Sequence, residues 1–213
     1  MNKIALRMMA VGALLAAGGS QAAGPSADIK VVGELVAPTC EVKLPNEGIF
    51  DFGSISHTKV SRDKAVSLGT RGLASMEVKC DAETPMTFNV IDNRLGTASE
   101  AGKTFGLGSI NATGKLGFYT IMAYFPRIDG KNGQLFVAQN NTITGGAGSV
   151  MLEHGKRVGW TPTSSSNKLA IGKNFTADLL VEAYLAKSGD MHGGVGEDTN
   201  LDGSTTLEFG FGL

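Results

Sequence analysis

The chain has 213 residues, of which 42% are apolar and 18% charged, and its formal net charge is −1. Acidic and basic residues are interspersed, which excludes the concentrated positive charge expected of proteins that bind nucleic acids or anionic membranes. The length suits a single domain with one sizeable core.

The first 22 residues have the pattern of a secretory signal peptide. Lys3 and Arg7 form a basic start, an apolar run covers residues 8–17, and the small residues Ser20 and Ala22 precede the expected cleavage point. A membrane anchor would need about 20 apolar residues, roughly twice this run. We therefore expect cleavage near Ala22, export of a single domain over residues 23–213, and no membrane insertion.

The remainder of the chain has the composition of an all-β protein. Gly is abundant, Pro is sparse, and short alternating apolar runs are separated by turn residues. The strands predicted from this alternation are residues 29–36, 41–44, 49–52, 75–80, 86–91, 117–124, 134–138, 150–153, 175–186 and 205–211. The stretches 92–116 and 126–148 have the Gly, Asn, Ser and Thr of long loops, which can hold further short strands. The number of strands indicates a sandwich or a closed barrel.

Residues 175–186 are the one segment of this exported domain where a helix competes with a strand. Leu179, Leu180 and Tyr184 also fit a helical stripe, but the odd-numbered apolar set from Phe175 to Leu185 is longer and more regular. The pattern therefore favours a strand.

Both ends of the exported domain have alternating apolar residues. Near its start the alternating face consists of Ala27, Ile29, Val31 and Gly33, and near its end it consists of Leu207, Phe209, Phe211 and Leu213. Chain termini are usually frayed unless something ties them into a sheet. We therefore expect both ends to form strands.

Cys40 and Cys80 are the only cysteines. In an exported chain an even pair predicts a disulfide rather than a redox or metal site, and the three scattered histidines do not complete a zinc site of about four ligands. Closing a loop of about 40 residues stabilises a fold by about 4 kcal/mol on the chain-entropy model. We expect this pair to act as a structural staple.

Several landmarks occur in a recognisable order. Gly33 precedes Cys40, the pair Phe52–Gly53 follows, and Cys80 closes an alternating strand. In these features the chain resembles the chaperone–usher fimbrial subunits, the pilins of Gram-negative bacteria. It is most similar to a branch of fimbrial-like proteins described as probable major subunits of beta-fimbriae. The stretches that carry this second likeness are ADIKVVGELVAPTC, FDFGSIS, VIDNR, KTFGLGS, KLGFYTIM and LDGSTTLEF.

The resemblance implies an immunoglobulin-like β-sandwich that lacks its last strand, leaving an apolar groove beside the C-terminal strand. It implies that a periplasmic chaperone fills this groove until the N-terminal segment of the next subunit replaces it at an outer-membrane usher. The groove residues would be Leu207, Phe209, Phe211 and Leu213. The donor segment would be residues 23–32, with Ala27, Ile29 and Val31 on its inserted face and Gly33 following.

The function implied by the resemblance is that of a structural subunit of a cell-surface fimbrium, which polymerises by donor-strand exchange with neighbouring subunits and supports cell adhesion. The chain departs from the family pattern at two positions. Many pilins have a Tyr where Gly212 stands, and Pro25 in the donor segment cannot donate a ladder hydrogen bond.

No motif in the sequence predicts catalysis or a cofactor. Asp198 to Gly203 resembles the start of a calcium loop, but its twelfth position is Phe209 instead of a bidentate Glu, which favours a polar turn. The Ser-x-x-Lys triplets that begin at Ser56, Ser61 and Ser165 lack the partner motifs of serine acylases. We therefore expect neither an enzyme, nor a bound metal, nor a cofactor.

The remaining candidate residues are one tryptophan and three histidines. His57, His154 and His192 lie in polar or Gly-rich stretches and are expected to be solvated loop residues. Trp160 is expected to pack in the core, whereas an exposed Trp160 could stack on a sugar. That possibility supports an alternative function: a monomeric secreted or fimbria-associated module that binds a glycan or a host protein.

Overall fold

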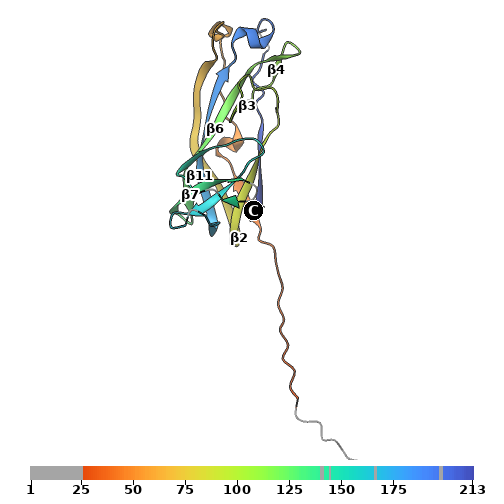
Figure 1. The fold of residues 1–213 in the computed structure, drawn as a ribbon, viewed down its shortest axis with the longest axis vertical. Coiled ribbons are helices and arrows are strands. Elements are labelled where there is room, and N and C mark those ends of the chain that lie inside the picture. The colour runs from red at the N-terminus through yellow and green to blue at the C-terminus, as the bar shows by residue number, and fades with distance from the viewer. Residues whose placement is uncertain (1–25, 140–141, 144, 166, 197–198) are drawn as a thin grey trace, which may run out of the picture. The chain divides into compact units, whose positions relative to one another are not determined.

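The computed structural model describes residues 26–139, 142–143, 145–165, 167–196 and 199–213 (Figure 1). The chain divides into two units, residues 1–36 and residues 37–213. The predicted signal peptide, residues 1–22, lies outside the described residues, as do residues 23–25 of the predicted donor segment.

The described part of the first unit, residues 26–36, contains no strand. The strand predicted at residues 29–36 is therefore wrong for this state of the chain. Ile29 and Val31 are 92% and 94% exposed. Alternating apolar residues favour a strand only where a neighbouring strand and an apolar face are available, and this segment has neither.

The second unit is all-β, as the composition predicts. Its strands are Cys40–Lys43 (β1), Val66–Asp92 (β2), Phe105–Gly106 (β3), Ser109–Ile110 (β4), Gly114–Lys115 (β5), Gly117–Ile128 (β6), Lys131–Gln139 (β7), Thr142–Ile143 (β8), Ser149–Met151 (β9), Arg157–Pro162 (β10), Ile171–Leu185 (β11) and Thr205–Phe211 (β12). Three short 3-10 helices accompany them: Pro45–Gly48 (η1), His57–Lys59 (η2) and Ser188–Met191 (η3). Among the residues described, no helix is both long and apolar enough to cross a bilayer.

The long strand β2 organises the sheet. Its residues 66–85 pair antiparallel with β11, and its residues 86–92 pair with β12. β1 pairs with residues 77–80 and β10 with residues 87–89. β11 lies between β2 and β6 (Figure 1), and β7 pairs with both β10 and β6. The pairings therefore close on themselves and form a sandwich-like sheet.

Several predicted elements differ from the structure. Residues 75–80 and 86–91 belong to one strand, because β2 continues while its pairing partner changes. Residues 49–52 are not a strand, since the ladder of β1 ends at the pair Lys43–Glu77 and leaves them without a partner. Strand β10 has no counterpart in the prediction, because its sequence, RVGWTP, contains turn-forming Gly and Pro.

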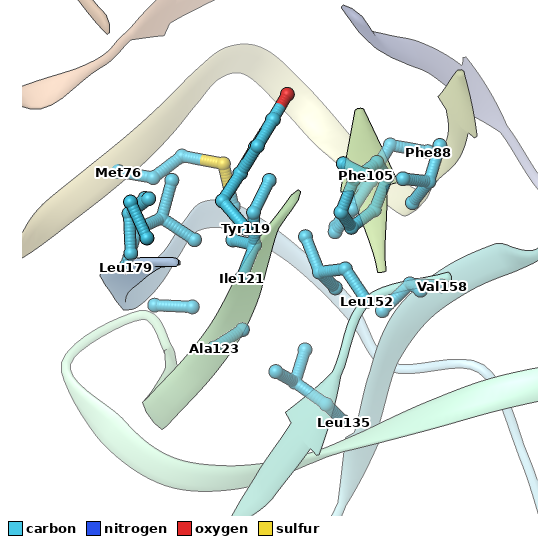
Figure 2. Close-up of a cluster of buried hydrophobic side chains, with 14 of the residues drawn as sticks. Met76, Phe88, Phe105, Tyr119, Ile121, Ala123, Leu135, Leu152, Val158 and Leu179 are labelled. Atoms are coloured by element: carbon cyan, nitrogen blue, oxygen red, sulfur yellow. The ribbon is translucent and has the colours of Figure 1, made fainter. Parts of the chain in front are cut away.

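The core forms where alternating residues from these strands meet. Met76, Phe88, Leu152 and Val158 are at most 1% exposed and gather in one cluster (Figure 2). The odd-numbered apolar side chains of β11 predicted from the alternation, Phe175, Ala177, Leu179, Val181, Ala183 and Leu185, are all buried. The strand interpretation of this segment is therefore confirmed over the helical one.

Trp160 is part of this core. Its side chain is fully buried, and its ring centroid lies 5.8 Å from that of Phe88 and 5.4 Å from that of Phe175. The indole Nε1–H donates a hydrogen bond to the carbonyl oxygen of Thr176 at 3.0 Å. Core packing is therefore confirmed, and sugar stacking by Trp160 is wrong. The alternative function as a binding module loses the side chain that supported it.

Candidate functional site

The predicted disulfide joins Cys40 to Cys80 and fixes β1 to β2. The two cysteines lie directly opposite each other in the antiparallel ladder. One residue further along each strand, the Thr39 N–H donates to the Asp81 carboxylate, and the Asp81 N–H donates to the Thr39 carbonyl oxygen, both at 3.0 Å. The start of the second unit is therefore held both covalently and by hydrogen bonds.

After Lys43 the chain leaves this ladder. Residues 44–60, which we call the wall segment, contain η1 and η2 and no strand. Phe50, Phe52, Ile55 and Val60 are half-buried and pack against the core, whereas Ile49 is 64% exposed. The wall segment thus presents an apolar inner side without the main-chain pairing that usually accompanies one.

Two residues of β2 hold the middle of the wall segment. The Arg71 Nε–H donates a hydrogen bond to the carbonyl oxygen of Asp51 at 2.8 Å, and its guanidinium carbon lies 4.9 Å from the ring centroid of Phe52. Gly72 follows, with a φ of +98°. A Cβ at Gly72 would lie 2.5 Å from the Leu179 carbonyl oxygen and 2.7 Å from the Phe50 ring. Phe50 therefore packs in a space that only Gly72 leaves free.

We expect Gly72→Ala to destabilise the fold by about 1–3 kcal/mol more than Gly69→Ala, because the added methyl group collides with Phe50 and Leu179. Gly69 has a similar φ of +84° but no atom within 4 Å of an added Cβ. It therefore controls for backbone strain alone. The measurement is urea-induced unfolding of both variants, and equal losses of stability would contradict the packing described for Phe50.

On the other side of this region, β12 is paired along one edge only. The Asn93 N–H donates to the Ser204 carbonyl oxygen at 2.9 Å, and the Gly212 N–H donates to the Pro85 carbonyl oxygen at 3.2 Å. Even-numbered residues of β12 therefore direct their main-chain groups toward β2. In an antiparallel strand the alternate residues direct theirs the other way, and no strand in the described ranges pairs with that second edge.

The four predicted groove residues have different surroundings. Leu207 and Phe209 are half-buried against the core, and the Phe209 ring centroid lies 5.3 Å from that of Phe88. Phe211 and Leu213 are 51% and 39% exposed. The structure thus brings the first two onto the core and leaves the last two open to solvent.

A cleft with a volume of about 730 Å³ separates the wall segment from the start of β12. Ile121 of β6 and Leu179 and Val181 of β11 line it from the core. From the wall segment, its lining includes Phe50, Phe52, Ile55 and Val60, and from the other side Val195, Leu201, Thr205 and Leu207. Of the predicted groove residues, only Leu207 lines this cleft. Its apolar lining, next to the unpaired edge of β12, makes it the candidate functional site.

The segment leading into β12 is fixed at Asp202. The Arg94 Nε–H donates to Asp202 Oδ2 at 2.8 Å, and the second guanidinium nitrogen lies 2.7 Å from Oδ1. This hydrogen-bonded pairing holds the pKa of the Asp202 carboxyl below its usual value. In the predicted calcium-like turn, Asp202 is therefore already engaged by Arg94, while Asp198 lies outside the described residues. The described part of the chain contains no group of three acidic, His or Cys side chains arranged to hold a metal.

Tyr119 of β6 connects the floor of the cleft to β12. Its hydroxyl lies 2.6 Å from Thr205 Oγ1 and points away from the apolar cluster (Figure 2). Burial disfavours the phenolate and raises the pKa of Tyr119 to about 12. The hydroxyl therefore stays protonated at physiological pH and serves as a hydrogen-bonding group.

The histidines lie apart from the cleft lining except His57, which is exposed in η2. His154 is half-buried, and its Nδ1 accepts a hydrogen bond from the Asp92 N–H at 2.9 Å. The prediction of a solvated loop residue is therefore wrong for His154. His192 Nδ1 lies 3.0 Å from Thr113 Oγ1 on the exposed surface.

Sequence reasoning missed the residues that shape the wall segment. Phe50 and Phe52 gave a usable signal, an alternation around Asp51, which led to a predicted strand instead of an irregular wall. Arg71, Gly72 and Arg94 gave none, because their roles depend on partners that are distant in sequence.

Comparisons with known proteins give two similarities. Residues 29–113 match a family described as a protein of unknown function (DUF1120), a stretch that contains both cysteines and the wall segment. The uncharacterized protein YhcF of Escherichia coli (strain K12) is 25% identical over 197 residues, which cover 82% of this chain and 79% of that protein. Neither description states an activity, so the similarities identify relatives of the sequence without assigning it a function.

Proposed function

We propose that the chain is a structural subunit of a bacterial chaperone–usher fimbrium, which polymerises by donor-strand exchange and supports cell adhesion. The observation that carries this proposal is the apolar cleft beside β12, a strand whose second edge has no partner among the described residues. Such an edge accepts an added strand, with main-chain hydrogen bonds supplying affinity and alternate side chains filling the apolar space.

The finer fold is part of the proposal. An immunoglobulin-like sandwich lacking its last strand would have β1, β11 and β6 with the first part of β2 in one layer, and β10, β7 and β12 with the rest of β2 in the other. The absent strand would then lie beside β12. At about 3.3 Å per residue, the seven residues of β12 offer a pairing edge of roughly 20 Å.

The donor strand in this proposal is the N-terminal segment of another copy of the chain. Ala27, Ile29 and Val31 would point into the neighbour's cleft, with Gly33 following. Ile29 and Val31 are almost fully exposed in the free chain, and burial of such side chains stabilises a complex by about 1.5–3 kcal/mol each. Because the donor segment and the cleft are different surfaces, each contact leaves both ends open and a filament grows.

Export and assembly complete the proposal. The predicted signal peptide directs the chain to the periplasm, where an oxidising environment accounts for the disulfide. A periplasmic chaperone would occupy the cleft, an outer-membrane usher would exchange it for the next subunit, and the finished fibre would lie outside the cell.

Periplasmic expression with and without the cognate chaperone tests the proposal. We expect the chaperone to yield a one-to-one complex, or a ladder of polymers that resists SDS, and we expect chain without the chaperone to aggregate or be degraded. Size-exclusion chromatography coupled to native mass spectrometry distinguishes these species. A stable monodisperse monomer that forms without the chaperone and never polymerises would contradict the proposal.

A further inference from the structure

We propose that Arg71 is a positioning residue that holds the wall segment against the domain and thereby sets how long the cleft retains a bound strand. This inference rests on the proposed function, since it concerns the cleft that would accept the strand. It adds a holding contact that Arg71 provides from outside the cleft lining.

The wall segment is tied firmly at its two ends. At the first end, β1 is fixed by the Cys40–Cys80 disulfide and its ladder with β2. At the second end, the Ser188 N–H donates a hydrogen bond to the carbonyl oxygen of Ser61 at 2.9 Å. Between these ends, the main-chain hydrogen bonds of the described structure are local, such as Ile49 N–H to the Asn46 carbonyl oxygen. The segment is therefore a strap with fixed ends.

The middle of the strap is attached to β2 through side chains. Arg71 contacts it twice, by the hydrogen bond to the Asp51 carbonyl oxygen and by the guanidinium face over Phe52. A third bond, from the guanidinium to the carbonyl oxygen of the adjacent Thr70 at 2.8 Å, fixes the orientation of the group. Arg71 itself is exposed, so the attachment is accessible to water and does not form part of the core.

The chemistry of the attachment favours Arg over Lys. A planar guanidinium can donate from Nε in its plane while its face stacks on an aromatic ring, whereas an ammonium group is a compact charge that does not reproduce this geometry. Arg71 thus holds Asp51 by the main chain and Phe52 by the ring. Its neighbour Gly72 provides the space for Phe50. Three consecutive residues of the strap are therefore held by two consecutive residues of β2.

The consequence concerns the cleft. Phe50 and Phe52 line it, so a strap that swings outward removes apolar lining from one side. A strand bound between the strap and β12 would then lose contacts and dissociate faster. Its association rate would change less, because an opened strap widens access to the cleft.

Hydrogen–deuterium exchange of the full chain tests the strap without any partner. We expect Arg71→Ala to raise exchange in residues 49–55 by about tenfold, since it removes a charge-assisted hydrogen bond and a cation–π contact. Arg71→Lys should give an intermediate rise, and Arg127→Ala, at another exposed arginine, should give none. Unchanged exchange in the strap, or an equal rise throughout β2 and β11, would overturn the proposal.

Binding of a synthetic peptide with the sequence of residues 26–36 to the full chain provides the second arm. We expect the peptide to dissociate about tenfold faster from Arg71→Ala than from the unmodified chain. The thermal midpoint of the peptide-free protein should change little, because Arg71 is outside the core. Equal dissociation rates for the unmodified chain, Arg71→Lys and Arg71→Ala would overturn the proposal. Absence of binding to the unmodified chain would instead contradict the proposed function, and the exchange arm would still decide the role of Arg71.

Discussion

Replacement of Ile29 and Val31 by Asn in the same chain is expected to abolish polymer formation while leaving the fold of residues 37–213 intact. Both side chains would enter a neighbour's apolar cleft, and losing them removes about 3–6 kcal/mol of transfer free energy. The introduced amides would also be buried without assured hydrogen-bond partners. Together these changes weaken the contact between copies by at least a hundredfold. The measurement is the SDS-resistant ladder in chaperone-expressing cells, with circular dichroism to verify the fold.

The matched control is the double replacement Val32→Asn with Val36→Asn. These valines are 90% and 79% exposed and lie on the opposite alternating face of the same segment. The chemical change is therefore similar and only the face differs. If the control abolished polymers as completely as the test variant, insertion of the odd-numbered face would be wrong.

Replacement of both Cys40 and Cys80 by Ser is expected to lower the free energy of unfolding by about 4 kcal/mol, because the unfolded chain regains the freedom of a loop of about 40 residues. Domains of this kind have unfolding free energies of about 5–15 kcal/mol, so the loss is a large fraction of the total. The same change releases the first fixed end of the wall segment. Urea-induced unfolding measures the stability, and hydrogen–deuterium exchange of residues 40–60 measures the release.

Reduction of the unmodified protein serves as the control for the disulfide variant. Reduced protein and the double Ser variant should unfold at the same urea concentration, because both have an open loop. A change in unfolding free energy of less than about 1 kcal/mol would contradict the staple role, since typical disulfides contribute about 2–4 kcal/mol.

The sequence predicts those parts of the fold that depend on local alternation. The odd-numbered face of β11 is buried as expected, because a run from Phe175 to Leu185 fits period two better than a helical period. Strand β12 has the predicted bounds, and the disulfide follows from two cysteines in a chain with a leader pattern. In each case the signal lies within a few residues or in a count.

Features that depend on distant partners escaped prediction. Residues 49–52 alternate like a strand but have no strand beside them, so they form part of an irregular wall. Residues 29–36 also alternate, yet they stay extended and exposed in the single chain. Phe211 continues the apolar face of β12 but reaches solvent. Alternation indicates what a segment can pair with, whereas the available neighbours determine whether it pairs.

The division of β2 between two sets of partners has a consequence for the time course of folding. Its pairing partners β11 and β12 follow it by about a hundred residues, as in the pairs Val78–Phe175 and Phe88–Phe209. Contacts so distant in sequence form slowly, because the entropy of closing a long loop must be lost before the contacts stabilise it. A chain made and exported from its N-terminus presents the apolar face of β2 well before either partner emerges. The strand on which both halves of the sheet depend is therefore the one that waits longest in an aggregation-prone state.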